Sequence, residues 1–449
     1  MSKQYKLKRG LDIKIAGSAT TAIEPAPESK IVALKPTDFA GLTPKLCVKA
    51  EAQVKAGDVL FFDKYNPEIL FTSPVSGTVK EIVRGERRKV LEIIVEADGK
   101  NEKVSFEKVN LANLKREQAV ELLLKSGLWP FIKQRPYGCL ANPKDTPKSI
   151  FISGFDSNPL GTDYEFIFHE EVESIQLAID ALGTLTNGKV FFGLPAKTSS
   201  IFQSLKNVEL NTFGGPHPAG NVGIHIHHIS PINKGDKIWT ISVQALVYFG
   251  RLLAHGELDM TKTIALAGSE VSSPKYYRTV HGANIAPLIE GKTKGETNER
   301  IISGTILTGT QVTAGGFLGF FDQEICVIPE GDEYELMGWA TPGFGKYSAS
   351  RTFVDKLMPK KAYNLNANLH GGERAFVVSG QYEKLLPMDI LPVYLLKAIL
   401  ANDLDKMEQL GLYEVIEEDL ALCEYACTSK IKVQDVLRQG IDSMIKELG

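Results

Sequence analysis

The sequence has little of several features that point to a particular class of protein. No stretch approaches the ~20 apolar residues of a membrane-spanning helix, and the basic N-terminus lacks the apolar run of a signal peptide. The 51 Lys plus Arg nearly balance the 54 Asp plus Glu, so nothing indicates a basic surface for nucleic acid. Five scattered cysteines, an odd number, argue against a secreted disulfide framework. We expect a soluble protein of a reducing compartment.

Motifs for the common cofactors are also missing. No G-x-G-x-x-G dinucleotide fingerprint occurs in the chain. Cys423 and Cys427 are four residues apart, but an iron–sulfur cluster needs four thiolates and the other cysteines fall in other predicted domains. His225 and His227 would share one face of a predicted strand, which is only half of a zinc site. We therefore expect neither a metal nor an iron–sulfur cluster on this chain.

The composition is that of an ordinary globular protein, with 43% hydrophobic and 23% charged residues. A length of 449 residues suggests about three domains. Alternation of apolar and polar residues, with a turn about every ten residues, predicts a small β barrel or sandwich before residue 105. Between 150 and 255, apolar β-branched runs alternate with helical stretches, which predicts a parallel α/β domain. Residues 256–335 are β-rich again, with β-rich runs at 263–268 and 300–309, and a helical region is expected after about 350.

Individual runs within these regions predict individual elements. Residues 1–38 look poor in strands. The strands expected in the α/β region are 149–153, 190–194, 222–226 and 238–243, and the helices are 171–182 and 199–205. One amphipathic helix is expected at the C-terminus, from an apolar stripe of Val433, Val436, Leu437, Ile441, Met444, Ile445 and Leu448.

Residues 54–79 resemble a biotinyl or lipoyl carrier domain. Lys64 follows Asp63 in a predicted hairpin turn, and Ser73-Pro74 and Gly77-Thr-Val79 come next. Carrier domains present a modified lysine in such a turn. Here Ser73-Pro74 follows the lysine later than in true carriers. Because ligases recognise the geometry of the hairpin, we favour an unmodified Lys64.

The most informative stretch is residues 126–163. Its layout is similar to the flavin-binding subunit of respiratory complex I and to its relative in the Rnf complex, where a glycine-rich loop holds the flavin phosphate. Here Trp129, Pro130, Phe131 and Arg135 replace that loop. Bulky side chains, and a proline without N–H, prevent backbone amides from approaching a phosphate. The resemblance therefore implies a dehydrogenase scaffold that has lost its flavin site.

Four segments together resemble the NqrA family, one of the subunit families of the Na⁺-translocating NADH:quinone oxidoreductases. They are Leu7–Gly17, Ser126–Tyr137, Pro387–Pro392 and Glu417–Cys427. The resemblance spans essentially the whole chain and implies an α/β multidomain protein. Its expected parts are a lipoyl-like β barrel-sandwich (1–105), a Rossmann-like α/β domain related to the complex I flavin subunit (106–255), a β-grasp (SLBB) domain (256–335) and a helical C-terminal domain (336–449).

The same resemblance implies a peripheral subunit on the cytoplasmic face of the bacterial inner membrane. The complex would pass electrons from NADH to a quinone such as ubiquinone and export Na⁺, with no complete catalytic site on this chain. Flavins, 2Fe-2S centres and NADH are expected on partner subunits, and quinone at or near this one. The candidate quinone contacts are Trp129, Phe131, Arg135 and Tyr137, where Arg135 or Tyr137 would donate to a quinone carbonyl. The alternative is that these residues fill the former flavin cavity.

Two other classes of protein stay open. A free-standing flavin or NADH dehydrogenase module would need unusual phosphate contacts, because the glycine loop is missing. A carrier modified at Lys64 would leave roughly 350 residues unexplained, far more than such a domain needs.

Overall fold

The computed structural model describes residues 3–197, 199–295, 298–332, 335–338, 340–350, 352–357 and 362–448. The α/β region is built on a seven-stranded sheet in the order β1-β14-β13-β12-β15-β10-β11. Its strands are β1 (Gln4–Lys6), β10 (Lys133–Arg135), β11 (Cys139–Leu140), β12 (Ser149–Ser153), β13 (Lys189–Pro195), β14 (Glu209–Gly214) and β15 (Ile238–Thr240). Neighbours from β1 to β15 are parallel, and β10 and β11 add an antiparallel edge. The predicted parallel α/β region is confirmed.

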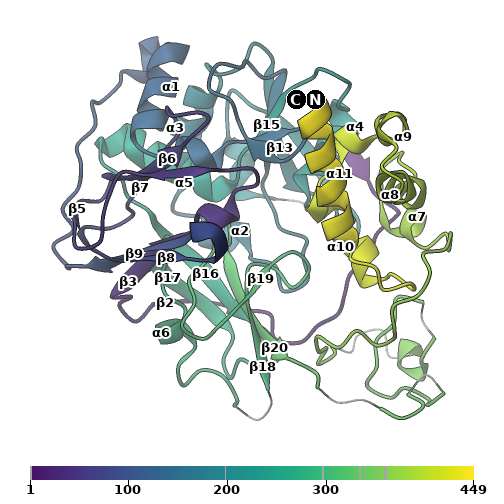
Figure 1. Cartoon of the computed structure of the whole chain (residues 1–449). Coiled ribbons are helices and arrows are strands. Elements are labelled where there is room, and N and C mark those ends of the chain that lie inside the picture. Colours follow the sequence, from purple (N-terminus) through teal and green to yellow (C-terminus); the bar gives the residue numbers. More distant parts are fainter. Residues whose placement is uncertain are drawn as a thin grey trace.

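The central strand β12 shows why both faces of this sheet are covered. Successive side chains of a strand point to opposite faces. Ile150 and Ile152 enter one core, whereas Phe151 enters a second. The first core includes helices α1 (Arg116–Lys125), α3 (Val172–Leu182) and α5 (Val243–His255), and the second includes α4 (Val222–Ile229) and the C-terminal helices. Figure 1 shows these two groups on opposite sides of the sheet.

Three element predictions in this region need correction. Residues 222–226 form helix α4 rather than a strand, because a short apolar run that is buried has the same pattern in either element. The strand predicted for 238–243 ends at Thr240, and the side chain of Ser242 then accepts the Ala245 N–H and caps α5. Residues 199–205 contain only a 3₁₀ turn, η5 (Ile201–Ser204).

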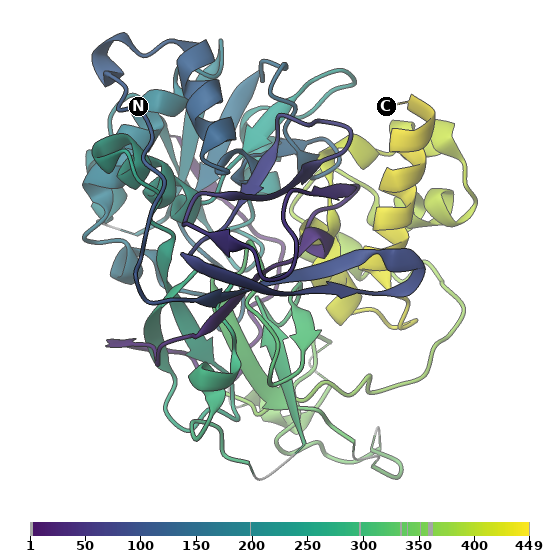
Figure 2. The same ribbon diagram turned by 60° about the vertical axis from the view of Figure 1, so that its left-hand side comes forward.

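The expected β-rich N-terminal region consists of two small antiparallel sheets (Figure 2). One has the order β3-β9-β8-β5 and the other β4-β6-β7. Their strands are β3 (Ile31–Leu34), β4 (Pro44–Leu46), β5 (Gln53–Val54), β6 (Val59–Asp63), β7 (Leu70–Thr72), β8 (Gly77–Arg84) and β9 (Val90–Ala97). Residues from both sheets join the same core as one face of the α/β sheet.

The first residues of the chain are not poor in strands, as the sequence had suggested. β1 pairs with β14 in the seven-stranded sheet, and β2 (Thr20–Pro25) pairs with β17 (Lys275–Val280) at the edge of another sheet. Both are edge strands with mostly exposed side chains, so they lack the apolar alternation that reveals a half-buried strand. Their hydrogen-bonding partners lie more than 200 residues away.

The third region is a six-stranded mixed sheet in the order β19-β18-β20-β16-β17-β2. Its other strands are β16 (Thr261–Ala267), β18 (Glu299–Ser303), β19 (Thr310–Val312) and β20 (Glu324–Pro329). Short helices α2 (Tyr164–Ile167) and α6 (Ala286–Ile289) lie in loops. Residues 300–309, which read as one β-rich run, contribute a strand only as far as Ser303.

Among the described residues, the α-helices of the C-terminal region begin at residue 382, later than the sequence suggested, and a 3₁₀ turn, η6 (Val354–Leu357), precedes them. They are α7 (Tyr382–Leu385), α8 (Pro392–Leu400), α9 (Leu404–Gln409), α10 (Glu417–Tyr425) and α11 (Val433–Leu448). The predicted helix is confirmed, and of its apolar stripe Val433, Leu437, Ile441 and Met444 are fully buried and Val436 is half-buried. Ile445 is exposed, contrary to the prediction, and the side chain of Leu448 lies outside the described residues. In the described ranges, no helix combines the length and apolar composition that crossing a bilayer requires.

Candidate functional site

The segment that replaces the glycine loop begins with a 3₁₀ turn, η4 (Trp129–Phe131), between α1 and β10. Trp129 is completely buried, and its indole Nε1 donates to the carbonyl of Ala141 at 2.8 Å. Its ring meets Trp239 of β15 edge to face, with 5.4 Å between the ring centroids. The indole therefore anchors the turn to the seven-stranded sheet.

Phe131 is also in the core. Its ring stacks on Phe320 with 4.3 Å between the centroids, and Tyr248 and His281 lie at 5.4 and 5.5 Å. Phe320 and His281 come from the region of the six-stranded sheet, whereas Tyr248 belongs to α5. Phe131 thus joins two regions of the protein through aromatic packing.

The backbone of this turn shows whether the segment could hold the phosphate of a flavin. The N–H of Phe131 donates to Leu128 O at 3.2 Å, and that of Ile132 donates to Trp129 O at 2.9 Å. Pro130 has no N–H to offer. The amides of Phe131 and Ile132 are therefore occupied inside the segment, and bulky buried side chains surround them. These residues do not fit a flavin phosphate.

Arg135, at the end of β10, is only 1% exposed. Its Nη1 donates to Asp419 Oδ2 at 2.7 Å and its Nη2 to Glu418 Oε1 at 2.6 Å. Burial by itself would lower the pKa of Arg135, but the two carboxylates more than offset this, so that the pKa is raised. Arg135 is thus a buried ionic contact between the α/β sheet and the first turn of α10.

The position of Asp419 explains why α4 has a glycine at residue 223. A Cβ atom at Gly223 would lie 2.3 Å from Asp419 Oδ1, so only glycine lets the carboxylate approach the helix. Asp419 Oδ2 also accepts the N–H of Ile416 at 2.9 Å, which caps α10. Asn221, just before α4, donates to the carbonyl of Glu418 at 3.0 Å. Sequence reasoning missed this cluster, although three successive acidic residues at 417–419 gave a signal.

Tyr137 is half-buried and separate from the other three candidate residues. Its ring faces Tyr413 with 6.1 Å between the centroids, and burial is the main cause that raises the pKa of Tyr137 to about 12. Its carbonyl accepts from Arg438 Nη1 at 3.2 Å. The structure therefore does not bring Trp129, Phe131, Arg135 and Tyr137 together around one opening, and Tyr137 has the most accessible side chain of the four.

Lys64 lies where the carrier resemblance placed it, in the turn between β6 and β7, and it is exposed. Its backbone N–H donates to Thr43 O at 2.9 Å, and its Nζ lies 5.4 Å from the ring centroid of Tyr65. The carboxylate of Asp63 shapes the turn by accepting from Tyr65 N and Asn66 Nδ2. Whether the lysine carries a modification stays a prediction.

The two histidines considered for zinc do not share a face, because they lie two residues apart on a helix rather than on a strand. His225 is buried, and its Nε2 donates to Ala219 O at 2.8 Å. Burial lowers its pKa to about 4. His227 pairs through Nδ1 with Glu414 at 2.8 Å. Within the described ranges, no three His, Cys, Asp or Glu side chains are grouped to hold a metal ion.

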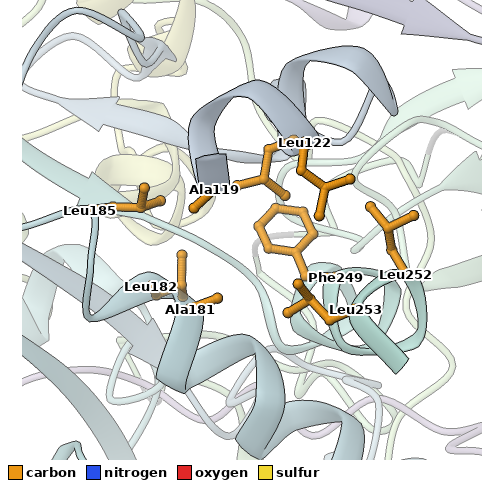
Figure 3. A pocket seen from close by; sticks show the side chains of 9 residues that line it. Ala119, Leu122, Ala181, Leu182, Leu185, Phe249, Leu252 and Leu253 are labelled. Carbon is orange, nitrogen blue, oxygen red and sulfur yellow. The ribbon is translucent and has the colours of Figure 1, made fainter. Parts of the chain in front are cut away.

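An apolar cavity lies between α1, α3 and α5 (Figure 3). Its volume of ≈ 10 Å³ is about what one water molecule occupies, so it cannot hold a nicotinamide, a flavin or a quinone. The side chains that line it are Ala119, Leu122, Leu123, Ala181, Leu182, Leu185, Phe249, Leu252 and Leu253. The cavity is a packing feature of the helical layer.

A larger hollow of ≈ 390 Å³ opens at the surface, beside the amino ends of β12, β13 and β15. Lys148 and Asp236 line it and form an ion pair at 2.8 Å. Ligands of open parallel sheets bind at the opposite edge, outside the carboxyl ends of the strands.

Comparison with known proteins places the whole chain in one class. Three family models match, and they describe the NqrA N-terminal barrel-sandwich hybrid domain (residues 5–98), the NqrA second alpha/beta domain (114–258) and the NQRA C-terminal domain (263–314). These models correspond in order to the small antiparallel sheets, the seven-stranded sheet and part of the six-stranded sheet. The class is thus a barrel-sandwich, α/β and C-terminal domain protein of the NqrA type.

The relatives extend this match to nearly every residue. The NqrA protein of the Na(+)-translocating NADH-quinone reductase of Yersinia pseudotuberculosis is 40% identical over 446 residues, which cover 98% of this chain and 99% of that one. The corresponding protein of Neisseria meningitidis is 38% identical over 447 residues, with the same coverage. A crystal structure of an NAD+-reducing [NiFe]-hydrogenase aligns with a TM-score of 0.40 and 11% identity, over 74% of this chain and 61% of that one, which is too distant to carry an argument. The chain belongs to the NqrA family of Na(+)-translocating NADH-quinone reductase subunits.

Proposed function

We propose that the chain is a peripheral subunit, without a redox cofactor of its own, of a Na⁺-translocating NADH:quinone reductase. It would sit on the cytoplasmic face of the bacterial inner membrane and support quinone reduction coupled to Na⁺ export. Flavins, 2Fe-2S centres and NADH would be held by partner subunits. The Rossmann-like and β-grasp (SLBB) assignments belong to the same proposal.

The buried turn Trp129–Phe131 carries the proposal that no flavin binds this chain. Its side chains are in the core, and the N–H groups of Phe131 and of the following Ile132 donate to carbonyls within the segment 128–132. A flavin phosphate would need those amides turned outward, with the aromatic side chains displaced. Together with family membership over the whole chain, this favours a subunit that positions other components rather than one that transfers electrons itself.

The same contacts bear on which of the four candidate residues could bind a quinone. Trp129 and Phe131 are buried, and the guanidinium of Arg135 binds two carboxylates. These contacts favour a structural role for the three residues. Of the four candidates, Tyr137 is best placed to meet a ligand from outside, and its substitution by Phe would test for loss of a quinone hydrogen bond in the assembled complex.

The proposal is tested by purifying a tagged chain from mildly solubilised membranes of the source cell. We expect flavin-containing partner subunits and Na⁺-stimulated NADH:quinone activity to co-elute with it. After separation from its partners, the chain should show no flavin absorbance and an unmodified intact mass. A chain that elutes alone with bound flavin would support the dehydrogenase alternative. A mass increase on Lys64 that matches a lipoyl or biotinyl group would support the carrier alternative.

A further inference from the structure

The hairpin of β8 and β9 carries a concentration of positive charge at its tip. Residues 84–89 read Arg-Gly-Glu-Arg-Arg-Lys, so four cations accompany a single acid. All five charged side chains are exposed. None of the four cations forms an ion pair with another described residue, whereas Lys80, lower on the same hairpin, lies 3.9 Å from Glu96. The tip is therefore a cationic cluster that this chain does not neutralise.

The hairpin extends beyond the sheet to which it belongs. β8 and β9 have eight residues each, but β3 pairs with β9 only at residues 93–96, and β5 pairs with β8 only at 77–78. The outer half, residues 80–92, is consequently a ribbon of two strands without a third. Figure 2 shows it as a long ribbon that leads away from the other strands of its sheet.

The backbone of the tip is strained at two arginines. Arg87 has a φ of 52° and Arg88 a φ of 61°, so two successive residues with Cβ atoms are left-handed. This conformation costs free energy for any residue except glycine, and turns usually place Gly, Asn or Asp there. The turn is closed by its own backbone, as Gly85 N–H donates to Lys89 O at 2.9 Å.

The side chains of the two strained arginines do not offset this cost within the chain. Each is exposed, and neither guanidinium has a hydrogen bond or ion pair with a described residue. Arg84 is used differently, because its Nη1 donates to the carbonyl of Arg88 at 3.0 Å and stiffens the turn. Backbone strain maintained at exposed cations indicates a function outside the fold.

We propose that this tip, residues 84–89, docks on a carboxylate-rich surface of another subunit of the same complex. Three of its four cations are arginines, whose planar guanidinium binds a carboxylate through two parallel hydrogen bonds. The closed turn fixes the backbone positions from which the arginine side chains extend, which suits a protein surface better than a fluid one. The tip also has no exposed apolar side chain to enter a bilayer, since Val83 is half-buried and Val90 is buried. This inference rests on the subunit role in the proposed function.

The test compares the tagged wild-type chain with Arg87→Gln/Arg88→Gln in the source cell. Complexes are bound from mildly solubilised membranes and washed with rising NaCl, and the flavin retained on the tag is measured. We expect the variant to release half of its partner flavin at a salt concentration at least two-fold lower than the wild type. The matched control is Lys49→Gln/Lys100→Gln, which removes two exposed lysines from the same region and should leave the release curve unchanged.

A second variant separates docking from folding. Arg87→Gly/Arg88→Gly relieves the left-handed strain, so the isolated chain should melt at a higher temperature than the wild type while its complex releases flavin at lower salt. A destabilised or unchanged fold with unchanged release would overturn the proposal. So would release of flavin by the Gln variant at the wild-type salt concentration.

A lipid surface is the competing partner, and vesicles test it directly. The isolated chain is sedimented with phosphatidylglycerol vesicles and, separately, with phosphatidylcholine vesicles. Binding of the wild type to phosphatidylglycerol alone, lost in Arg87→Gln/Arg88→Gln while flavin release stays normal, would assign the tip to the membrane and overturn our proposal. If the wild-type chain retains no flavin subunit even at low salt, the proposed function itself fails, whatever the tip does.

Discussion

The ionic contact at Arg135 offers the sharpest test of how the C-terminal helices are held. The Arg135 side chain is 2% exposed and that of Asp419 is completely buried. In Arg135→Met the aliphatic part of the side chain is retained, but the Asp419 carboxylate is left in the interior without its counter-charge. Its Oδ2 keeps only the N–H of Ile416, and its Oδ1 has no hydrogen bond in the described structure.

Removing one partner of a buried ion pair costs about 3–5 kcal/mol. At ~1.4 kcal/mol per tenfold change, that corresponds to a roughly 10²- to 10³-fold or larger increase in the open population of the docked helix. The loss should be local, because Arg135 joins α10 to the sheet rather than holding the sheet together. Hydrogen exchange measured on peptides that span 417–425 and, as a reference, 149–153 is the appropriate assay. A melting curve or a urea titration reports the chain as a whole, so it would not separate a local loss in α10 from the rest of the molecule.

Two further variants serve as comparisons for Arg135→Met. Lys189→Met removes an exposed ion pair with Glu209 and should change the free energy of opening, measured by hydrogen exchange, by no more than about 1 kcal/mol. In Arg135→Met/Asp419→Asn the fully buried carboxylate is neutralised, and the only carboxylate that has lost its partner is that of Glu418, whose side chain is 40% exposed. Protection of α10 should therefore recover part of what Arg135→Met alone loses. A free energy of opening of 417–425 in Arg135→Met within about 1 kcal/mol of the wild type would refute the role assigned to the Arg135 contact. So would a further loss of protection when Asp419→Asn is added.

Three other substitutions test separate parts of the structure. Gly250→Ala should lower the free energy of unfolding in a urea titration, although it adds ~1 kcal/mol of helix propensity, because the new Cβ atom would lie 1.9 Å from the carbonyl oxygen of Ser174 in α3. Gly183→Ala is the control, since its Cβ atom would make only ordinary contacts, and it should be neutral or stabilising in the same titration. Burial lowers the pKa values of His217 and His225 to about 4; the unfolded chain therefore takes up these protons first as the pH falls below about 6.5, and each histidine should cost about 2 kcal/mol of stability at pH 5 that is restored above pH 7. An Asn substitution of either histidine that leaves the pH dependence of urea unfolding unchanged would contradict this. Trp129→Phe removes the indole N–H that donates to the carbonyl of Ala141, so it should lower the free energy of unfolding by about 1–3 kcal/mol in the same titration. An unaltered urea midpoint would count against the anchoring role of Trp129.

Some elements could be predicted because the relevant information is local. The strand at 149–153 is a β-branched and aromatic run, and the stripe in 433–448 repeats at helical spacing, so each pattern points to one element. The missing glycine loop could also be seen in the sequence, since it concerns residue types at adjacent positions. Helix α4 was wrongly predicted because eight residues, mostly apolar, are too few to distinguish the two periods.

The candidate site was less predictable than the fold. The quinone candidates 129–137 are adjacent in sequence, yet their side chains point to different surroundings, the aromatic ones into the core and Tyr137 toward Tyr413. The partner of Arg135 lies 284 residues further along the chain. No local pattern identifies such a partner, because the ends of so long a loop are brought together only by the packing of everything between them.

The class of chain follows from local features of the sequence alone. Its near-neutral charge, its lack of cofactor motifs, its change from β to α/β to β to helical periodicity and its family motifs are all properties of residue types and spacings. The folded structure was needed to show that Trp129 and Phe131 are core residues, that Arg135 is an ionic contact, and that the cations at 84–89 form no ion pair within the described chain. The physical reason is that burial, charge pairing and pKa depend on distances between residues far apart in sequence, and those distances exist only once the chain has folded.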